Sequence, residues 1–153
     1  YAERARIWSD KVRDIHEFLV AIGHRTPEGE GIHKTVAYHD SCHLAHGQKI
    51  TTAPRQVLDT IPGIERRELH EADWCCGSAG VYNITQPEMS MQLQERKMNN
   101  IQKTGADVVA AANPGCIIQL VHGAKRCGVD VEVKHPISLL AEAYRREPVS
   151  RIT

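Results

Sequence analysis

The chain has 153 residues, 41% of them apolar, and its 19 basic and 19 acidic side chains give a formal net charge of zero. That length suits one α/β domain with a core of its own. The charge balance lacks the basic excess that sequence-independent binding to DNA or RNA requires, so we expect no nucleic-acid partner. The sequence has no apolar run near the ~18 residues of a membrane span and no signal-peptide pattern at its start, which favours a soluble protein. Its odd number of cysteines favours reduced thiols and therefore a cytoplasmic protein.

The first half of the chain predicts a helix, a strand, a second helix and a weaker strand. An apolar stripe at helical spacing predicts an amphipathic helix over residues 5–22, which Gly23 ends. A short buried strand is expected at 35–40, then a helix with Pro54 in its first turn, and then a weaker strand at 66–70. The stripe of the first helix consists of Ile7, Trp8, Val12, Ile15, Phe18, Leu19 and Ile22.

The second half repeats this alternation. Thr85 and Glu88 have capping-box spacing and predict the start of a helix that Gly105 ends. The later elements are a strand at 107–112, a helix ended by Gly128, a strand at 129–135 and a helix at 137–145. Alternating strands and helices predict an α/β fold with a mostly parallel four-stranded sheet flanked by helices, because parallel neighbours need crossover connections. We expect an N-terminal helix and linker at 1–34 and the main domain at 35–147.

Five cysteines are an odd number for a disulfide framework, and two of them are adjacent, so we interpret them as reduced thiols. Four follow the carboxyl ends of predicted strands, where the loops of a parallel sheet converge on one crevice. Thiolates suit soft metals and iron–sulfur clusters, and neighbouring glycines let backbone N–H groups approach the sulfurs. We predict a metal site formed by Cys42, Cys75, Cys76 and Cys116. Cys127 continues the helical stripe of Leu120 and Ala124, which predicts a core residue.

Histidines offer a competing ligand set. Cys42 and His46 are four residues apart, so one helical turn would place both on one side. With Cys76 and Cys116 this pair would make a Cys/His zinc site. Cys42 activated by His43 or His46 is a further alternative, as the nucleophile of a thiol enzyme, although that interpretation gives the Cys-Cys-Gly segment no role. A scaffold without metal is the simplest alternative.

Two more histidines stand near the ends of predicted strands. His39 lies at the end of the first strand and His135 at the end of the last. From these positions either ring could hydrogen-bond the sulfurs of a cluster and tune its potential. Because most single histidines are surface or core residues, we assign neither of them as a metal ligand.

Three strings of residues resemble the C-terminal cysteine-rich CCG domain of glycolate oxidase iron–sulfur subunits, a domain shared with heterodisulfide reductase and lactate-utilisation subunits. They are Tyr38–Leu44, Asp73–Gly80 and Ala112–Cys116. In that family a cysteine, a CCG segment and a terminal CxxC bind an iron–sulfur cluster. This chain departs from the pattern at Asn113, which stands where the first cysteine of CxxC is expected.

The resemblance implies a non-catalytic electron-transfer subunit with an iron–sulfur cluster of the 4Fe-4S type. The Cys/His spacing described above gives zinc as the alternative metal. Its implied partners are an FAD-containing glycolate oxidase subunit, other subunits of that complex and a membrane quinone as acceptor, with contact to the inner face of the cytoplasmic membrane through these partners. Because the chain begins at Tyr1 inside a predicted helix, we expect a C-terminal fragment of a longer subunit. The residues expected to contact the ligands are His43, His46, Gly77, Asn113, Gly115 and His135.

Overall fold

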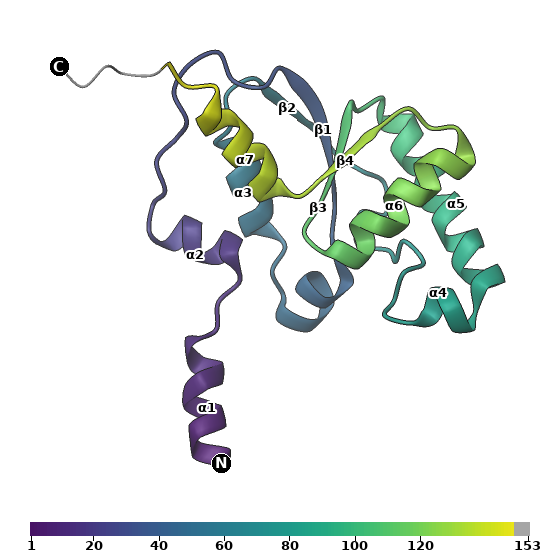
Figure 1. The fold of residues 1–153 in the computed structure, drawn as a ribbon, viewed down its shortest axis with the longest axis horizontal. Coiled ribbons are helices and arrows are strands. Elements are labelled where there is room, and N and C mark those ends of the chain that lie inside the picture. Colours follow the sequence, from purple (N-terminus) through teal and green to yellow (C-terminus); the bar gives the residue numbers. More distant parts are fainter. Residues whose placement is uncertain (149–153) are drawn as a thin grey trace.

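A parallel β-sheet forms the centre of the computed structural model, which describes residues 1–148 (Figure 1). The described strands are β1 (Lys34–His39), β2 (Ile64–Arg67), β3 (Val108–Ala111) and β4 (Glu132–Lys134). They lie in the order β2-β1-β3-β4, and each neighbouring pair is parallel. The predicted α/β class with a four-stranded parallel sheet and an N-terminal helix is confirmed.

Helices cover both faces of this sheet. The described helices are α1 (Ala2–Lys11), α2 (Ile15–Ala21), a π-helical segment (His43–Gln48), α3 (Thr52–Asp59), α4 (Tyr82–Thr85), α5 (Pro87–Thr104), α6 (Pro114–Cys127) and α7 (Pro136–Arg145). α3 packs against α7, and α5 packs against α6, on opposite sides of the sheet (Figure 1). From the central strands, β1 connects through α3 to β2 at one edge of the sheet, and β3 connects through α6 to β4 at the other edge. Because both crossovers have the same hand, α3 and α6 cover opposite faces, and a crevice forms between the carboxyl ends of β1 and β3.

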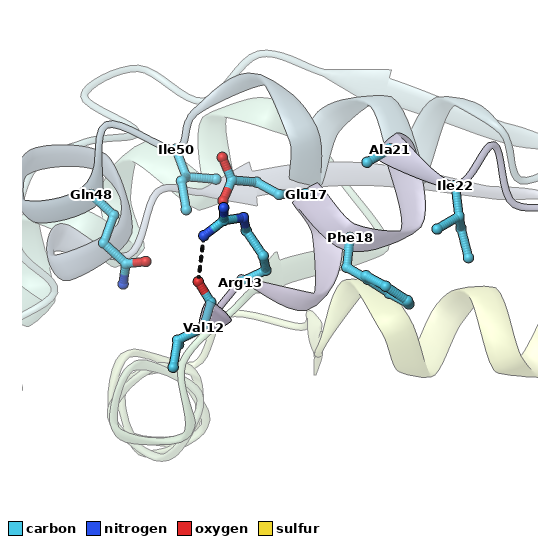
Figure 2. A pocket seen from close by; sticks show the side chains of 8 residues that line it. All are labelled: Val12, Arg13, Glu17, Phe18, Ala21, Ile22, Gln48 and Ile50. Atoms are coloured by element: carbon cyan, nitrogen blue, oxygen red, sulfur yellow. Dashed lines mark hydrogen bonds between the residues drawn. The ribbon is translucent and has the colours of Figure 1, made fainter. Parts of the chain in front are cut away.

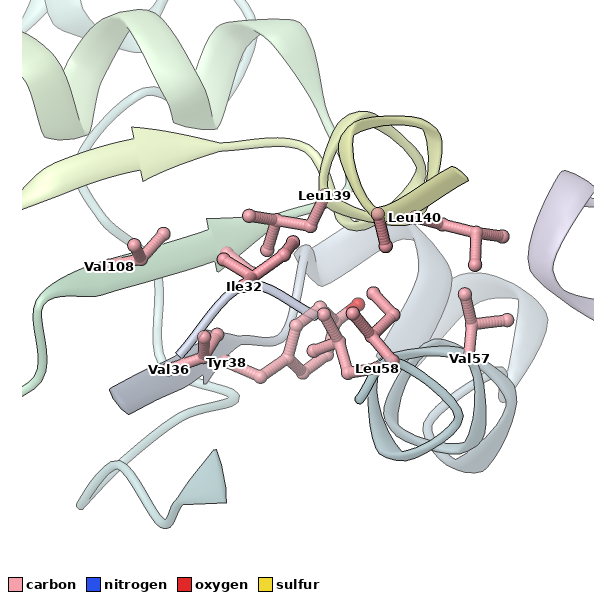
Figure 3. Packing of buried hydrophobic residues seen from close by; sticks show 11 residues of the cluster. Ile32, Val36, Tyr38, Val57, Leu58, Val108, Leu139 and Leu140 are labelled. Carbon is pink, nitrogen blue, oxygen red and sulfur yellow. The ribbon is translucent and has the colours of Figure 1, made fainter. Parts of the chain in front are cut away.

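Strand alternation divides the core between the two faces. Val36 and Tyr38 of β1 belong to the core under α3 and α7, whereas Ala37 belongs to the core under α5 and α6. On the first face these strand residues meet the fully buried Leu58 and Leu139 (Figure 3). Burial of each such leucine contributes about 1.5–3 kcal/mol, so the strands that carry the crevice are firmly held.

The single N-terminal helix predicted over residues 5–22 is wrong. The chain forms α1 and α2 instead, with Val12 in an extended conformation between them. The cause is Asp14, whose carboxylate accepts a hydrogen bond from the backbone N–H of His16 at 2.9 Å and caps α2. α1 points away from the sheet (Figure 1), and within residues 1–148 none of its side chains is buried.

Two smaller details also differ from expectation. The second strand begins two residues before the predicted 66–70 and ends at Arg67. Thr85 does not cap α5 but ends α4, where its hydroxyl donates to the carbonyl of Val81 at 3.3 Å. The glycine ends of α5 and α6 are confirmed, since Gly105 and Gly128 take left-handed φ angles of 59° and 64°.

None of the described helices combines the length and the hydropathy that a membrane span needs.

Candidate metal centre

Three donor atoms converge beside the carboxyl ends of β1 and β3. A ring nitrogen of His39 and the sulfurs of Cys76 and Cys116 all lie within 4.8 Å of one another. All three residues are buried. His39 is the last residue of β1, and Cys116 lies in the first turn of α6, which follows β3. The crevice between β1 and β3 therefore holds two thiols and an imidazole.

Asn113 shapes the approach of Cys116 to this crevice. It is the N-cap of α6, and its side-chain oxygen accepts a hydrogen bond from the backbone N–H of Cys116 at 3.1 Å. Pro114 follows in the first turn, where its missing N–H costs nothing. The oxygen of Asn113 is thus occupied by the helix start, as expected of an asparagine that shapes a turn.

Gly77 lets the Cys75–Cys76 segment pack tightly against α5. Its φ of 93° favours glycine, and a Cβ atom there would lie 2.4 Å from the backbone oxygen of Ser90. The hydroxyl of Ser90 donates to the carbonyl of Gly77 at 2.7 Å, and the N–H of Gly77 donates to the sulfur of Cys75 at 3.3 Å. Ser90 of α5 therefore fixes the backbone of this segment, and the N–H of Gly77 stabilises the sulfur of Cys75.

A buried chain of hydrogen bonds links this segment to α6. The amide of Gln119 donates to the hydroxyl of Ser90 at 3.1 Å, and the amide of Gln94 donates to the carbonyl of Gln119 at 2.8 Å. Gly115 completes the fit, because a Cβ there would lie 3.0 Å from the Ser78 hydroxyl. Since α6 also carries Cys116, these contacts set the separation of Cys76 and Cys116.

The two buried thiols shift each other's pKa in opposite directions. The neighbouring Cys116 raises the pKa of Cys76 to about 12, and burial adds to that effect. The neighbouring Cys76 lowers the pKa of Cys116 against the opposing effect of burial, and Ser41 adds to the lowering. A metal cation would remove the protons from both, because a coordinated thiol is deprotonated.

The remaining two cysteines of the expected set surround this pair. Cys75 is half-buried, and its pKa is raised by the neighbouring Cys76 and by burial and lowered by the N–H of Gly77. Cys42 is exposed at the start of the π-helical segment that follows β1. Neither belongs to the group of donors within 4.8 Å that the described residues form.

A buried cation that sequence reasoning missed lies beside these groups. Lys97 of α5 is 2% exposed, and its ammonium donates to the carbonyls of Glu71 and Ala72. Burial lowers the pKa of Lys97, and the charge of Cys76 raises it. A signal was present in the sequence, because Lys97 shares helical spacing with the buried Gln94 and Ile101.

The donor set fits a soft or borderline metal. Burial lowers the pKa of His39 to about 3, with a smaller effect of the nearby Lys97, so the imidazole is neutral and offers a lone pair at neutral pH. Among the described residues its Nδ1 is buried without a hydrogen-bond partner. Two thiols and an imidazole are ligand types of zinc and of iron–sulfur centres.

The other histidines singled out by the sequence lie elsewhere. His43 and His46 are exposed, and Nε2 of His46 pairs with the carbonyl of Asp73 at 3.0 Å. The zinc set that joined Cys42 and His46 to the buried cysteines is therefore not assembled within residues 1–148. His135 stacks on His16 with ring centroids 5.3 Å apart, and it caps α7. Cys127 packs at the edge of the core, as predicted.

A surface groove beside α2 has a different character. It lies between α2 and the end of the π-helical segment and includes Val12, Phe18, Ile22 and Ile50 (Figure 2). Its lining contains no cysteine or histidine among the described residues. The chemistry-bearing residues are therefore gathered at the strand ends and not in this groove.

Comparisons with known proteins agree with the motif positions. The family model described as "CCG: Cysteine-rich domain" matches residues 36–121, a range that includes Cys42, Cys75, Cys76 and Cys116. The chain is 39% identical over 146 residues to the probable glycolate oxidase iron-sulfur subunit of Bacillus subtilis (strain 168), which covers 94% of this chain and 33% of that protein. It is 32% identical over 140 residues to lactate utilization protein A of Shouchella clausii (strain KSM-K16), covering 92% and 59%. The chain thus spans only part of these relatives.

Proposed function

This chain belongs to the cysteine-rich CCG domain family, and from that premise we propose that it is an iron–sulfur electron-transfer domain of a complex that oxidises a 2-hydroxy acid. The observation that carries the proposal is the convergence of Cys76, Cys116 and His39 in the crevice between β1 and β3. Parallel sheets bind their ligands at this kind of switch point. The names of the relatives, an iron-sulfur subunit and a lactate utilization protein, supply the redox chemistry and the substrate class.

We assign the protein ligands of the cluster to Cys42, Cys75, Cys76 and Cys116, and the cluster to the 4Fe-4S type. An iron–sulfur cluster supplies a site that accepts and releases one electron at a time. The chain's own residues prepare that site. The N–H of Gly77 supports the Cys75 thiolate, and the Lys97 ammonium lies close enough to offset negative charge near Cys76. The exposed Cys42 places one side of the site at the surface, where an electron partner can approach.

The same family supports the partners that we propose. We propose that an FAD-containing subunit of the glycolate oxidase type oxidises the 2-hydroxy acid and gives electrons to this domain. A membrane quinone is the proposed final acceptor, reached at the cytoplasmic face through other subunits of the complex. The name of the Bacillus subtilis relative supports glycolate as the substrate to test first, and the lactate utilization names support lactate as the comparison.

Anaerobic reconstitution tests the cofactor. The chain is incubated with ferrous iron and sulfide, and bound iron, bound sulfide and thiolate-to-iron absorption are measured. We expect uptake by the unaltered chain and loss of uptake in C76S and C116S. C127S is the matched control, because Cys127 is a half-buried cysteine of the same helix as Cys116 but lies at its far end. Equal uptake by C76S and C127S would remove Cys76 from the ligand set.

Dye reduction tests the role in the complex. A full-length subunit carrying this domain is co-expressed with its flavoprotein partner, and glycolate-dependent and D-lactate-dependent reduction of a dye are measured. We expect turnover by the complex, a fall when Cys76 or Cys116 is replaced, and none by the isolated 153-residue chain. Turnover by the isolated chain would contradict electron transfer and favour the thiol-enzyme alternative, in which His43 or His46 activates Cys42.

A structural zinc site is the second candidate, and the donor types favour it. One imidazole and two thiols within 4.8 Å match three ligands of a tetrahedral zinc site. Metal analysis of anaerobically purified protein separates the two functions. One zinc per chain without iron or sulfide, retained after exposure to ferrous iron and sulfide, would favour the structural site over electron transfer.

A further inference from the structure

We propose that His39 is itself a ligand of the metal centre, so that the centre has mixed cysteine and histidine ligation. The inference rests on the proposed iron–sulfur function and revises its ligand set, because a 4Fe-4S cluster takes four protein ligands. His39 joins the buried Cys76 and Cys116 and takes the place of one of the two more exposed cysteines, Cys42 or Cys75. The observation behind it is that His39, Cys76 and Cys116 are the described donors that lie within 4.8 Å of one another.

The backbone of β1 aims His39 at the cysteines. Successive side chains of a strand point to opposite faces, so His39 shares the face of Ala37. Ala37 lies in the same core cluster as Cys76 and Cys116. His39 is paired with Ala111, the last residue of β3, which places the imidazole at the carboxyl edge of the sheet where α6 begins. The direction of the ring is therefore a consequence of strand register.

The buried imidazole of His39 has a nitrogen atom that needs a hydrogen-bond partner or a metal ion. His39 is 1% exposed, and its Nδ1 has no hydrogen-bond partner among the described residues. A buried nitrogen left without a partner destabilises the fold, and a metal ion bound to that nitrogen would remove this penalty. The ring also lies beside the carbonyl of Ala72, and ligating histidines commonly direct their second nitrogen to such a carbonyl.

The proximity of the three donors suits ligation of one centre. His39, Cys76 and Cys116 place their donor atoms within 4.8 Å of one another. The imidazole therefore lies beside both sulfurs, and side-chain rotations adjust the spacing without a change of the strands.

Neighbouring residues do not offer the same donor. Asn113, three residues before Cys116, uses its side-chain oxygen to cap α6. His46 is exposed and holds the carbonyl of Asp73, and His43 is exposed as well. Among the described histidines, His39 is the one placed within reach of both buried sulfurs.

Selective isotope labelling tests this ligand without altering the protein. The 153-residue chain is produced with histidine labelled with 15N in the imidazole ring only, reconstituted anaerobically with ferrous iron and sulfide, and studied in its paramagnetic state by pulsed EPR. We expect a strongly coupled nitrogen whose 14N signal is replaced by a 15N signal on labelling. Backbone N–H groups that only hydrogen-bond sulfur stay 14N and do not change. A cluster with no strongly coupled histidine nitrogen would overturn the proposal and leave the iron–sulfur function standing.

Two substitutions identify the residue. H39C offers a sulfur in place of the nitrogen, so we expect this variant to keep the cluster and to lose the histidine signal. Its midpoint potential should shift downward, because histidine ligands raise the potential relative to cysteine. H46Q is the matched control from the loop after the same strand and should keep signal and potential. An unchanged histidine signal in H39C, or its loss in H46Q, would overturn the assignment. Failure of the unaltered chain to take up iron and sulfide would instead refute the proposed function, and this inference with it.

Discussion

The turn at Gly77 offers a direct test of how the site is built. Gly77 has a φ of 93°, and an added Cβ would lie 2.4 Å from the backbone oxygen of Ser90 and 3.0 Å from the Gln119 amide nitrogen. Real Cβ atoms do not approach backbone oxygens so closely, so G77A must move the Cys75–Cys76 segment away from α5. Gly80 is a natural control in the same loop, because its φ is 64° but no described atom lies within 4 Å of the position that a Cβ would take there.

The two changes separate backbone strain from the clash. A left-handed φ costs a non-glycine residue about 1–2 kcal/mol, which is the whole effect expected for G80A. G77A adds overpacking of about 1–3 kcal/mol, since the obstacle is backbone and cannot swing aside. If the segment moves, the hydrogen bond from Ser90 to the carbonyl of Gly77 is lost as well, at about 1 kcal/mol or more. We therefore expect G77A to lower the free energy of unfolding by about 3–6 kcal/mol.

Urea unfolding followed by circular dichroism measures this difference, and reconstitution measures its effect on the site. We expect G77A to lose iron and sulfide uptake, because the sulfur of Cys76 no longer faces that of Cys116, whereas G80A keeps uptake. A difference in unfolding free energy below about 0.5 kcal/mol between the two variants, with equal uptake, would refute the idea that contact with Ser90 positions the cysteines.

Three further predictions concern charged groups. R55M should lower the free energy of unfolding by about 3 kcal/mol in urea titrations, because it leaves the buried carboxylate of Asp40 without its two hydrogen bonds of 2.7 Å. The double variant R55M/D40N should be less destabilised than R55M, and an equal loss of unfolding free energy in the two variants would contradict this reasoning. K97M should shift the midpoint potential of the reconstituted centre downward in a redox titration, because a buried cation near Cys76 favours the reduced state, and an upward shift would contradict that role. Burial and the charge of His16 lower the pKa of His135, so the unfolded chain binds a proton more readily than the folded chain, and stability should fall as the pH drops below about 6.5. H135Q should weaken this dependence of the urea midpoint on pH between about pH 7.5 and 5.5. An unchanged pH dependence in H135Q would exclude His135 as its source.

Much of the fold was accessible from local patterns. Short buried strands, helices with apolar stripes and glycines at helix ends are all short-range features, and Gly105 and Gly128 do end α5 and α6 in left-handed conformations. The N-terminal region shows the limit of this reasoning. The stripe continues across residues 12–14, but Asp14 uses its carboxylate to cap α2, and this local bond interrupts the helix that the periodicity indicates.

The candidate site divides in the same way. The sequence by itself determined that cysteines follow the carboxyl ends of strands, and that glycines flank them, because both are statements about neighbours along the chain. Only the tertiary structure decided that His39 joins Cys76 and Cys116 while His46 and His135 do not, and that Lys97 lies beside them. Those contacts depend on the strand order β2-β1-β3-β4 and on which face each crossover helix covers. Periodicity tells which residues share a face of one element, but the pairing of faces between distant elements is set by the packing of the whole core.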